Sequence, residues 1–456
     1  DDGNRYISEA VNAGCVAVLT DIYDPFLENV TQLISQNVAG LEADLVAQFY
    51  GGPSDSLFTV GITGTNGKTI TSYLVKHLLE QFDGSVGLVG TVEYIVGRSH
   101  YAATRTTPDI STNHKLLREM VMNDCKAAVM EVTSHGLDQG RVANIDFDVA
   151  IFTNLSLDHL DYHGDMDAYC AAKAKLFQGL GKTSSKKVYT GPKFAVVNRE
   201  DPRSGDIVKD CQATVLWYGF GKECDVRAEN VELSHLGTEF DLVYQGQRQA
   251  VKWPLIGRFN VYNYLAAASV GICRGWALKD VVKALDSFEG VKGRLQEVPN
   301  RLGVQVLVDF AHTDDALRNV LECLTEVQKG RIITVFGCGG CRDRSKRPKM
   351  AAAAEKYSSF VIVTSDNPRL EAPEAICAEI AQGFSSKEGY CIEPDRRLAI
   401  RKAVEEADLG DIVLIAGKGH ECYQVFAHET IEFDDVREAQ RICEEVAEER
   451  TAFSVV

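Results

Sequence analysis

The sequence lacks any apolar run near the roughly 20 residues that a membrane-spanning helix requires. Its most apolar stretch, residues 265–273, is short and contains serine and glycine. We therefore expect no membrane-embedded segment and no membrane partner.

Basic residues are also scarce. The 456-residue chain carries 48 Lys and Arg against 65 Asp and Glu, which gives a formal net charge of −17. A surface this acidic repels the phosphates of nucleic acid, so we expect no nucleic-acid partner. An anionic ligand must instead be held by local cations or by helix N-termini.

Thirteen cysteines occur without a repeated spacing, and an odd number cannot all pair. In a long chain this is typical of reduced thiols, which predicts a cytoplasmic location. One Cys-x-x-Cys run is present, from Cys338 to Cys341, but no second ligand pair lies at the usual spacing for zinc. We interpret Cys338 and Cys341 as part of a glycine-rich turn rather than as a metal or redox site.

The length predicts two to four domains. Hydrophobic residues make up 45% and charged residues 25% of the chain, which is ordinary globular composition. Residues 1–56 begin without Met and read as a helix followed by a strand, so we expect the remainder of a small α/β domain whose front is missing. A turn-forming Gly-Gly-Pro-Ser run at residues 51–54 marks its end.

Residues 57–297 alternate short apolar runs with helical patterns. This alternation predicts a mostly parallel sheet covered by helices. Residues 224–253 alternate apolar and polar side chains, as antiparallel strands do. The expected strands are 57–64, 85–89, 127–132, 149–154 and 194–198, and the expected helices are 69–81, 262–274 and 278–287.

Residues 298–456 repeat the alternation on a smaller scale. Buried strands are expected at 304–310, 332–336, 360–365 and 411–416. Helices are expected between them at 314–327, 346–357, 373–384 and 396–407. The pattern predicts a doubly wound, Rossmann-like domain, so the whole chain is an α/β protein of three domains.

The strongest motif is a phosphate-binding loop, Gly61-Ile-Thr-Gly-Thr-Asn-Gly-Lys-Thr69, between a predicted strand and a predicted helix. Glycines let backbone N–H groups face phosphate oxygens. In this mechanism Lys68 reaches the β- and γ-phosphates and the Thr69 hydroxyl ligates Mg²⁺. The Asn-Lys-x-Asp signature of guanine-binding switch proteins is absent, which favours ATP.

Three further side chains are candidates for chemistry near this loop. Glu131 ends a strand, where a carboxylate suits Mg²⁺, although a solvated strand-end Glu has the same position. His159 lies between Asp158 and Asp161 after the next strand, as a metal ligand or as an ordinary loop histidine. Spacing alone makes Lys173 a surface helix lysine.

Together these motifs resemble the Mur ligases of peptidoglycan precursor synthesis, in particular the type that adds meso-diaminopimelate. The match spans essentially the whole chain. It rests on the phosphate loop and on runs at residues 106–108, 131–135, 153–161, 169–173, 260–263, 293–294, 309–312, 366–369 and 417–421.

The resemblance implies an N-terminal UDP-sugar domain, a central ATPase and a C-terminal Rossmann-like domain, here 1–56, 57–297 and 298–456. It also implies the reaction. ATP phosphorylates the free carboxylate of UDP-N-acetylmuramoyl-L-Ala-D-Glu, and the amine of meso-diaminopimelate attacks the acyl phosphate. The expected cofactors are ATP and Mg²⁺, and we expect a monomer.

Site residues follow from the same resemblance. The catalytic set is Lys68, Glu131, His159 and Lys173, and the metal ligands are Thr69, Glu131, His159 and Lys173 as a carbamate. The ATP set is Gly64, Thr65, Asn66, Gly67, Lys68, Thr69, Ile70, Asn260, Asn263, Arg294 and Asp309. The UDP-muramoyl dipeptide set is Thr106, Thr107, Thr133, Gln139 and Arg141. The meso-diaminopimelate set is Arg342, Asp366, Asn367, Pro368, Arg369, Gly417 and Glu421.

The chemistry of the amino acid supports the last set. Meso-diaminopimelate carries one carboxylate more than lysine, so a selective site needs an additional cation. Arg369 suits bidentate carboxylate binding, and Pro368 stiffens the turn that aims it. Glu421 and the Gly417 carbonyl can accept the distal ammonium.

Two other functions remain open at this point. A folate polyglutamate ligase shares the phosphate loop, but it does not explain the run at residues 366–369 or the threonine pair at 106–107. A slow ATP-hydrolysing switch would need neither a UDP-muramoyl peptide nor an amino acid.

Overall fold

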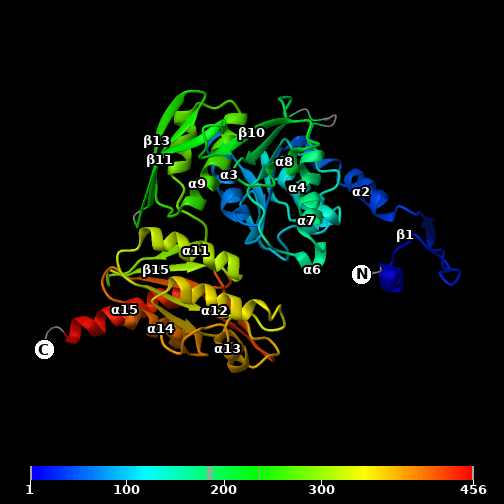
Figure 1. The fold of residues 1–456 in the computed structure, drawn as a ribbon. Helices are drawn as coiled ribbons and strands as arrows, with labels where there is room; N and C mark the ends of the chain where they lie inside the picture. Colours follow the sequence, from blue (N-terminus) through cyan, green and yellow to red (C-terminus); the bar gives the residue numbers. More distant parts are fainter. Residues whose placement is uncertain (1–2, 182–185, 187, 236, 454–456) are drawn as a thin grey trace.

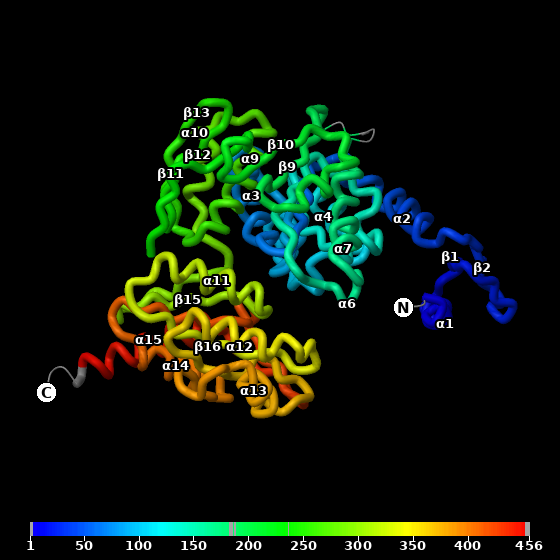
Figure 2. The backbone as a smooth tube through the Cα atoms, viewed as in Figure 1, coloured from blue at the N-terminus to red at the C-terminus, as the bar shows by residue number. Residues whose placement is uncertain are grey.

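The computed structural model describes residues 3–181, 186, 188–235 and 237–453. Three bodies follow one another along the chain (Figure 1). The first projects away from the other two, whereas the second and third lie against each other (Figures 1 and 2). Among the described residues, no helix combines the length and apolarity needed to cross a bilayer.

The N-terminal body is small. Strands β1 (Ala17–Thr20) and β2 (Thr31–Ile34) pair in parallel. Helices α1 (Ile7–Asn12) and α2 (Val38–Phe49) accompany them, and η2 (Pro53–Ser56) leads into the second body. Few of its side chains are buried, with Val18, Thr20 and Ala43 as examples.

The central body is built on a sheet of eleven strands, in the order β13-β12-β11-β10-β9-β8-β3-β7-β4-β5-β6. Strands β7 and β4 on one side of β3, and β8, β9 and β10 on the other side, run parallel to it. The outer strands at both ends of the sheet form antiparallel hairpins. Their bounds are β3 Phe58–Thr63, β4 Val86–Val89, β5 Glu93–Val96, β6 Ser99–Ala102, β7 Ala127–Glu131, β8 Val149–Phe152, β9 Phe194–Asn198, β10 Thr214–Gly219, β11 Val226–Ser234, β12 Gly237–Tyr244 and β13 Gln247–Trp253.

Strand β3 lies at the point where the strand order reverses. It pairs with β7 on one side and with β8 on the other. Where the strand order reverses, the connections on the two sides run in opposite directions, and a crevice opens at the carboxyl ends of the strands. The loop after β3 therefore enters the natural ligand site of the sheet.

Helices cover both faces of this sheet. One core contains side chains of α3 (Lys68–Asp83), α9 (Arg258–Cys273) and α10 (Leu278–Asp286). The other contains side chains of α4 (Ile110–Met122), α5 (Ser134–Asp138), α7 (Met166–Gln178) and α8 (Ser204–Val208). Helix α9 is buried along most of its length, which agrees with the mainly apolar sequence of its second half, residues 265–273.

The C-terminal body has six strands in the order β14-β15-β19-β16-β17-β18, and only β14 is antiparallel to its neighbour. Their bounds are β14 Gln296–Val298, β15 Gln305–Asp309, β16 Ile332–Phe336, β17 Phe360–Val363, β18 Tyr390–Ile392 and β19 Ile412–Ala416. The helices are α11 Asp314–Val327, α12 Lys346–Tyr357, α13 Pro373–Ala381, α14 Arg396–Glu406 and α15 Asp435–Phe453, and a hairpin pairs β20 Tyr423–Val425 with β21 Thr430–Glu432.

The predicted α/β class, with a large, mostly parallel central sheet and a separate C-terminal sheet, is confirmed. Several predicted elements agree with the structure to the residue, among them β16, α11 and α12. The pattern assigned no element to residues 435–453, where the structure has the long helix α15.

Candidate active site between two domains

The phosphate loop joins β3 to α3 and is shaped by contacts to the loop after β8. Gly64 and Gly67 adopt φ values of +148° and +85°. A Cβ on Gly64 would lie 1.9 Å from the Thr153 hydroxyl oxygen, and one on Gly67 would lie 2.5 Å from Asn263 Oδ1. Asn154 holds the turn, because its carbonyl accepts the Thr65 N–H at 2.8 Å. Only glycine fits these two positions.

Lys68 opens helix α3 and folds over this loop. Its Nζ donates to the carbonyls of Gly64 at 2.9 Å and Thr65 at 2.8 Å. Burial lowers the pKa of Lys68, while the nearby Glu131 carboxylate opposes that shift. The amine is thus held where the N-terminus of α3 and the loop amides converge.

Glu131 ends β7 and is fully buried. Its carboxylate accepts hydrogen bonds from the hydroxyls of Thr69 at 3.0 Å and Thr91 at 2.9 Å, and from the Thr91 N–H at 3.0 Å. Sequence reasoning missed Thr91, although its place just beyond a strand end was a signal. The alternative prediction, that Glu131 is a solvated residue at a strand end, is wrong.

The Thr69 and Glu131 oxygens fit Mg²⁺. Both groups are hard oxygen donors, and they lie 3.0 Å apart beside the phosphate loop. Arg294 of the interdomain linker also reaches the Thr69 hydroxyl, at 3.4 Å.

Lys173, on α7, is 1% exposed. Its Nζ donates to the Gly64 carbonyl at 2.9 Å and lies 4.5 Å from the centre of the Tyr169 ring. Burial, together with the neighbouring Lys68 cation, holds the pKa of Lys173 well below its usual value. The surface position expected from helix spacing alone is wrong, because the Lys173 side chain is buried against the phosphate loop.

His159 precedes α6 (Leu160–His163) in a left-handed conformation, with φ of +54°. Its Nε2 lies 3.4 Å from Asp158 Oδ2, and its ring contacts that of His135 at 4.8 Å between centroids. No group of three His, Cys, Asp or Glu side chains suited to a metal occurs among the described residues. A second metal at His159 therefore needs oxygen ligands that unmodified Lys173 does not offer.

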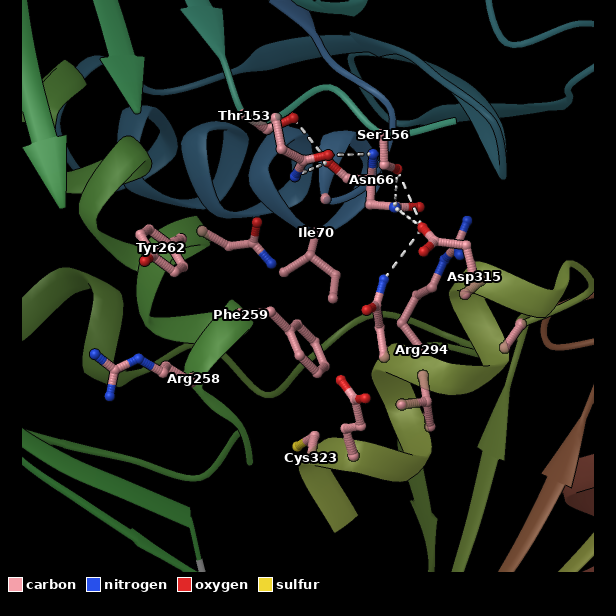
Figure 3. A pocket seen from close by; sticks show the side chains of 18 of the residues that line it. Asn66, Ile70, Thr153, Ser156, Arg258, Phe259, Tyr262, Arg294, Asp315 and Cys323 are labelled. Atoms are coloured by element: carbon pink, nitrogen blue, oxygen red, sulfur yellow. Dashed lines mark hydrogen bonds between the residues drawn. The ribbon is translucent and has the colours of Figure 1, made fainter. Parts of the chain in front are cut away.

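A cavity of about 520 Å³ lies between the phosphate loop and the C-terminal body (Figure 3). Asp309 at its edge accepts the N–H groups of Leu295 at 2.7 Å and Ala311 at 2.8 Å, and burial raises the pKa of Asp309. Six residues of the expected ATP set line the cavity: Asn66, Gly67, Ile70, Asn263, Arg294 and Asp309.

The other ATP residues surround this cavity. Asn260 is buried behind it, where its Oδ1 accepts a hydrogen bond from Asn263 at 3.1 Å. Gly64, Thr65, Lys68 and Thr69 continue the loop. Among the lining residues that sequence reasoning missed are Arg258, Phe259 and Tyr262, which lie on the same first turns of α9 as Asn260.

Of the five residues expected to bind the UDP-muramoyl dipeptide, four are connected by hydrogen bonds near the end of β7, and Thr106 contacts Thr91. The Thr107 hydroxyl donates to the Glu131 carbonyl at 2.9 Å and accepts from the Thr133 hydroxyl at 3.1 Å. Arg141 donates to the Thr107 carbonyl at 2.8 Å and to Gln139 Oε1 at 2.6 Å. The Thr106 hydroxyl contacts that of Thr91 at 3.1 Å.

A second, larger cavity of about 1170 Å³ opens on the other side of the phosphate loop. Thr65, Asn66 and residues 156–161 form its central-domain wall. Its C-terminal wall contains Arg342, Asp366, Asn367, Arg369, Gly417 and Glu421. Of the expected amino-acid set, only Pro368 does not line the cavity. His312, which the sequence did not single out, does.

The two cavities meet at one interdomain contact. Asp315 at the start of α11 accepts hydrogen bonds from Asn66 at 3.2 Å and from Ser156 at 3.1 Å, and these three residues line both cavities (Figure 3). A nucleotide in one cavity and an amine in the other would therefore approach the same end of the phosphate loop.

Two family models match the chain. The Mur ligase middle domain matches residues 62–271, and the Mur ligase, glutamate ligase domain matches residues 293–419.

Curated relatives match over most of the chain. A UDP-N-acetylmuramoyl-L-alanyl-D-glutamate–2,6-diaminopimelate ligase of Chlamydia abortus is 46% identical over 437 residues, which cover 95% of this chain and 88% of that protein. The protein of that name from Listeria monocytogenes is 41% identical over 440 residues, which cover 96% of this chain and 88% of that protein.

Solved structures agree in fold. A UDP-N-acetylmuramoyl-L-alanyl-D-glutamate–2,6-diaminopimelate ligase superposes with a TM-score of 0.68 at 34% identity, covering 97% of this chain and 89% of its own. A folylpolyglutamate synthase of Mycobacterium tuberculosis, complexed with ADP and AMPPCP, has a TM-score of 0.68 at 20% identity and covers 83% of this chain and 92% of its own.

Proposed function

The chain belongs to the Mur ligase family, and we propose that it adds meso-diaminopimelate to UDP-N-acetylmuramoyl-L-Ala-D-Glu at the expense of ATP, in peptidoglycan precursor synthesis. The observation that carries this function is the meeting of the two cavities at Asn66, Ser156 and Asp315. One cavity lies beside a phosphate loop, and the other is lined by three arginines, Arg318, Arg342 and Arg369. A ligase needs its activated carboxylate and its amine at such a junction.

We propose that the reaction passes through an acyl phosphate, because a carboxylate is a poor electrophile without a leaving group. The dipeptide carboxylate takes the γ-phosphoryl group of ATP, which leaves ADP. The deprotonated amine of the amino acid then attacks the carbonyl carbon, and the tetrahedral intermediate expels phosphate. Phosphate carries away the oxygen that the carboxylate supplied.

Phosphoryl transfer between two anions requires positive charge in the transition state. Lys68 supplies one cation from the start of α3, and Arg294 supplies another from the linker, where its Nη2 lies 3.4 Å from the Thr69 hydroxyl. Thr69 and Glu131 would hold Mg²⁺, which when bound neutralises phosphate charge and orients the phosphoryl group.

We propose that Lys173 carries a carbamate. Only a neutral amine reacts with CO₂, and the lowered pKa of buried Lys173 favours that form. Formation of the new N–C bond releases one proton from the neutral amine and gives an anion with two oxygen atoms. These oxygens, with His159, would hold a second Mg²⁺ near the acceptor carboxylate.

The UDP-muramoyl dipeptide and the amino acid would bind to separate groups of residues. Thr106, Thr107, Thr133, Gln139 and Arg141 are the groups proposed to hold the UDP-muramoyl dipeptide. In the larger cavity, Arg369 would bind the distal carboxylate of the amino acid and Arg342 the second one. Glu421 and the Gly417 carbonyl would accept its distal ammonium.

We assign UDP-sugar binding to residues 1–56, ATP binding and catalysis to 57–297, and amino-acid binding to 298–456. The second boundary falls at β14, the first strand of the C-terminal sheet. We further propose that the enzyme acts as a cytoplasmic monomer. All thirteen cysteines are free, which is consistent with a reducing compartment.

One assay tests this function against its alternatives. Purified protein is supplied with ATP, Mg²⁺, UDP-N-acetylmuramoyl-L-Ala-D-Glu and each of a panel of amino acids, and phosphate release and product mass are measured. We expect release only with both the nucleotide peptide and meso-diaminopimelate. Release with a folate and glutamate, or with ATP alone, would instead identify a folate ligase or a switch.

A further inference from the structure

We propose that Glu371, held by the buried Arg347, is a positioning residue that fixes the spacing between Arg342 and Arg369 and so favours an amino acid with two carboxylates over one with a single carboxylate. The inference rests on the proposed function of the amino-acid cavity. Neither Glu371 nor Arg347 lines that cavity, so any effect on the substrate passes through other residues.

Arg347 lies on α12 and is fully buried. Its Nη1 donates to Glu371 at 2.9 Å and to Glu379 at 2.7 Å, and its Nη2 donates to Glu371 at 3.0 Å. The Arg347 guanidinium and the Cys341 N–H lower the pKa of Glu371 to about 2. Glu371 is therefore charged at every pH at which the enzyme would be assayed.

Glu371 joins the two loops that carry the arginines. Arg342 lies in the loop after β16, and Arg369 lies in the loop after β17. From the second loop, Glu371 Oε1 accepts the N–H of Cys341, the residue next to Arg342, at 2.5 Å. The carboxylate thus connects Arg347 on the helix with both loops.

Further contacts bring the loops together at Gly340. Its N–H donates to the Asn367 carbonyl at 2.9 Å, and its own carbonyl accepts from Arg369 Nη1 at 2.9 Å. A Cβ on Gly340 would lie 1.9 Å from the Pro368 carbonyl oxygen, so no side chain fits there. Pro368, absent from the cavity wall, therefore packs against the opposite loop.

This contact also explains the Cys-Gly-Gly-Cys run. Cys338 is buried, with Sγ 3.6 Å from the sulfur of Met350, while Cys341 is exposed and adopts a φ of +54°. The glycines permit the close approach of the two loops, and both cysteines are free thiols.

Two arginines at a fixed separation discriminate between substrates by geometry. Meso-diaminopimelate places a carboxylate at each end and can pair with both guanidinium groups. Lysine leaves one of them unpaired. If the loops can shift relative to each other, the two arginines no longer match the spacing of the two carboxylates, and binding of meso-diaminopimelate weakens. Binding of lysine, which has one carboxylate, weakens less.

The alternative is an ion pair that only stabilises the fold. Such a pair would lower the melting temperature when disrupted and would alter all kinetic constants together. Glu371→Gln separates the two roles, because Glu379 still pairs with Arg347 and no unpaired charge is buried. Glu374→Gln is the matched control, since Glu374 is exposed nearby at the start of α13.

The experiment measures KM and kcat of each variant for meso-diaminopimelate, L-lysine, ATP and the UDP-muramoyl dipeptide, with the melting temperature. For Glu371→Gln we expect KM for meso-diaminopimelate to rise about tenfold and the preference over L-lysine to fall by a similar factor. KM for ATP should change less than about twofold, and Glu374→Gln should match the wild type. Glu371→Asp, which keeps the charge on a shorter side chain, should be intermediate, and it replaces Glu371→Gln if that variant does not fold.

A second comparison uses Arg369→Ala as the background. There, Glu371→Gln should have a clearly smaller effect on meso-diaminopimelate than in the wild type, because one of the two positioned groups is gone. An undiminished effect there, an unchanged KM for meso-diaminopimelate, or an equal change for every substrate would overturn the positioning role. A wild-type enzyme that fails to ligate meso-diaminopimelate in the same assay would instead overturn the proposed function.

Discussion

Lys68 and Lys173 donate to the same oxygen atom, the carbonyl of Gly64, each at 2.9 Å. Two ammonium ions at one carbonyl repel each other in a site with little water. Burial and the Lys68 cation hold the pKa of Lys173 well below its usual value, and burial lowers the pKa of Lys68 as well. The phosphate loop thus keeps two lysine amines side by side where burial disfavours the charged form of each.

For Lys173→Ala we expect nearly complete loss of ligation, with kcat reduced by about a thousandfold or more. The variant lacks the nitrogen on which the carbamate forms. Addition of a small carboxylic acid such as acetate should restore part of the activity, because its oxygens can occupy the space of the carbamate. Product formation with and without acetate is the measurement, and full activity without it would contradict the carbamate.

For Lys68→Ala we expect a loss of similar size, on the order of a thousandfold and mainly in kcat. The cation is needed where charge develops on the transferred phosphoryl group. Lys76→Ala is the control, since Lys76 lies on the same helix, beyond the phosphate loop, and pairs with Glu80. Circular dichroism checks the fold, and near-normal turnover would show that the loop assignment is wrong.

For Arg369→Ala we expect turnover of meso-diaminopimelate to fall at least about a hundredfold in kcat/KM, with ATP binding little changed. Removing the guanidinium leaves the distal carboxylate without its partner. The wild type should strongly reject L-lysine, since lysine would leave Arg369 unpaired. Competition between the two amino acids measures this preference, and equal use by the wild type would refute this role of the cavity. Arg437→Ala, at an exposed pair with Glu432, is the control.

The stability of the central domain should depend on the protonation of Asp286. Burial raises the pKa of Asp286 to about 6, and its carboxyl lies 3.1 Å from the Tyr264 hydroxyl. The unfolded value is about 3.9, so the folded state binds more protons between roughly pH 4 and pH 6. This group therefore contributes stability below about pH 4 that is lost as the pH rises through about 6.

Asp286→Asn should remove this contribution. The variant should gain stability relative to the wild type as the pH rises from about 4 to about 6, by an amount on the order of 1 kcal/mol, because the site is only half buried. Denaturant unfolding at a series of pH values measures the difference. A difference that does not change across this interval would show that the Asp286 pKa is not raised.

Features that depend on neighbouring residues were predictable from the sequence. The phosphate loop, the alternation of strands and helices, and elements such as α11 and α12 follow from short-range patterns of glycine and apolar residues. The order of the motifs along the chain then indicated the family. Helix α15 was missed because its narrow apolar stripe, with Ala439, Ile442 and Val446, lies among many charged residues.

Only the tertiary structure decided the environments of the reactive groups. Lys173 reads as a surface residue on its helix but lies buried against Gly64, a residue 109 positions away in the chain. Glu131 gains its hydroxyl partners from two separate segments, and Glu371 joins two loops that share no motif. The sequence determined which groups the chain carries and which local turns it makes. Burial, pKa and spacing depend on contacts between distant segments, and these exist only once the sheets have formed.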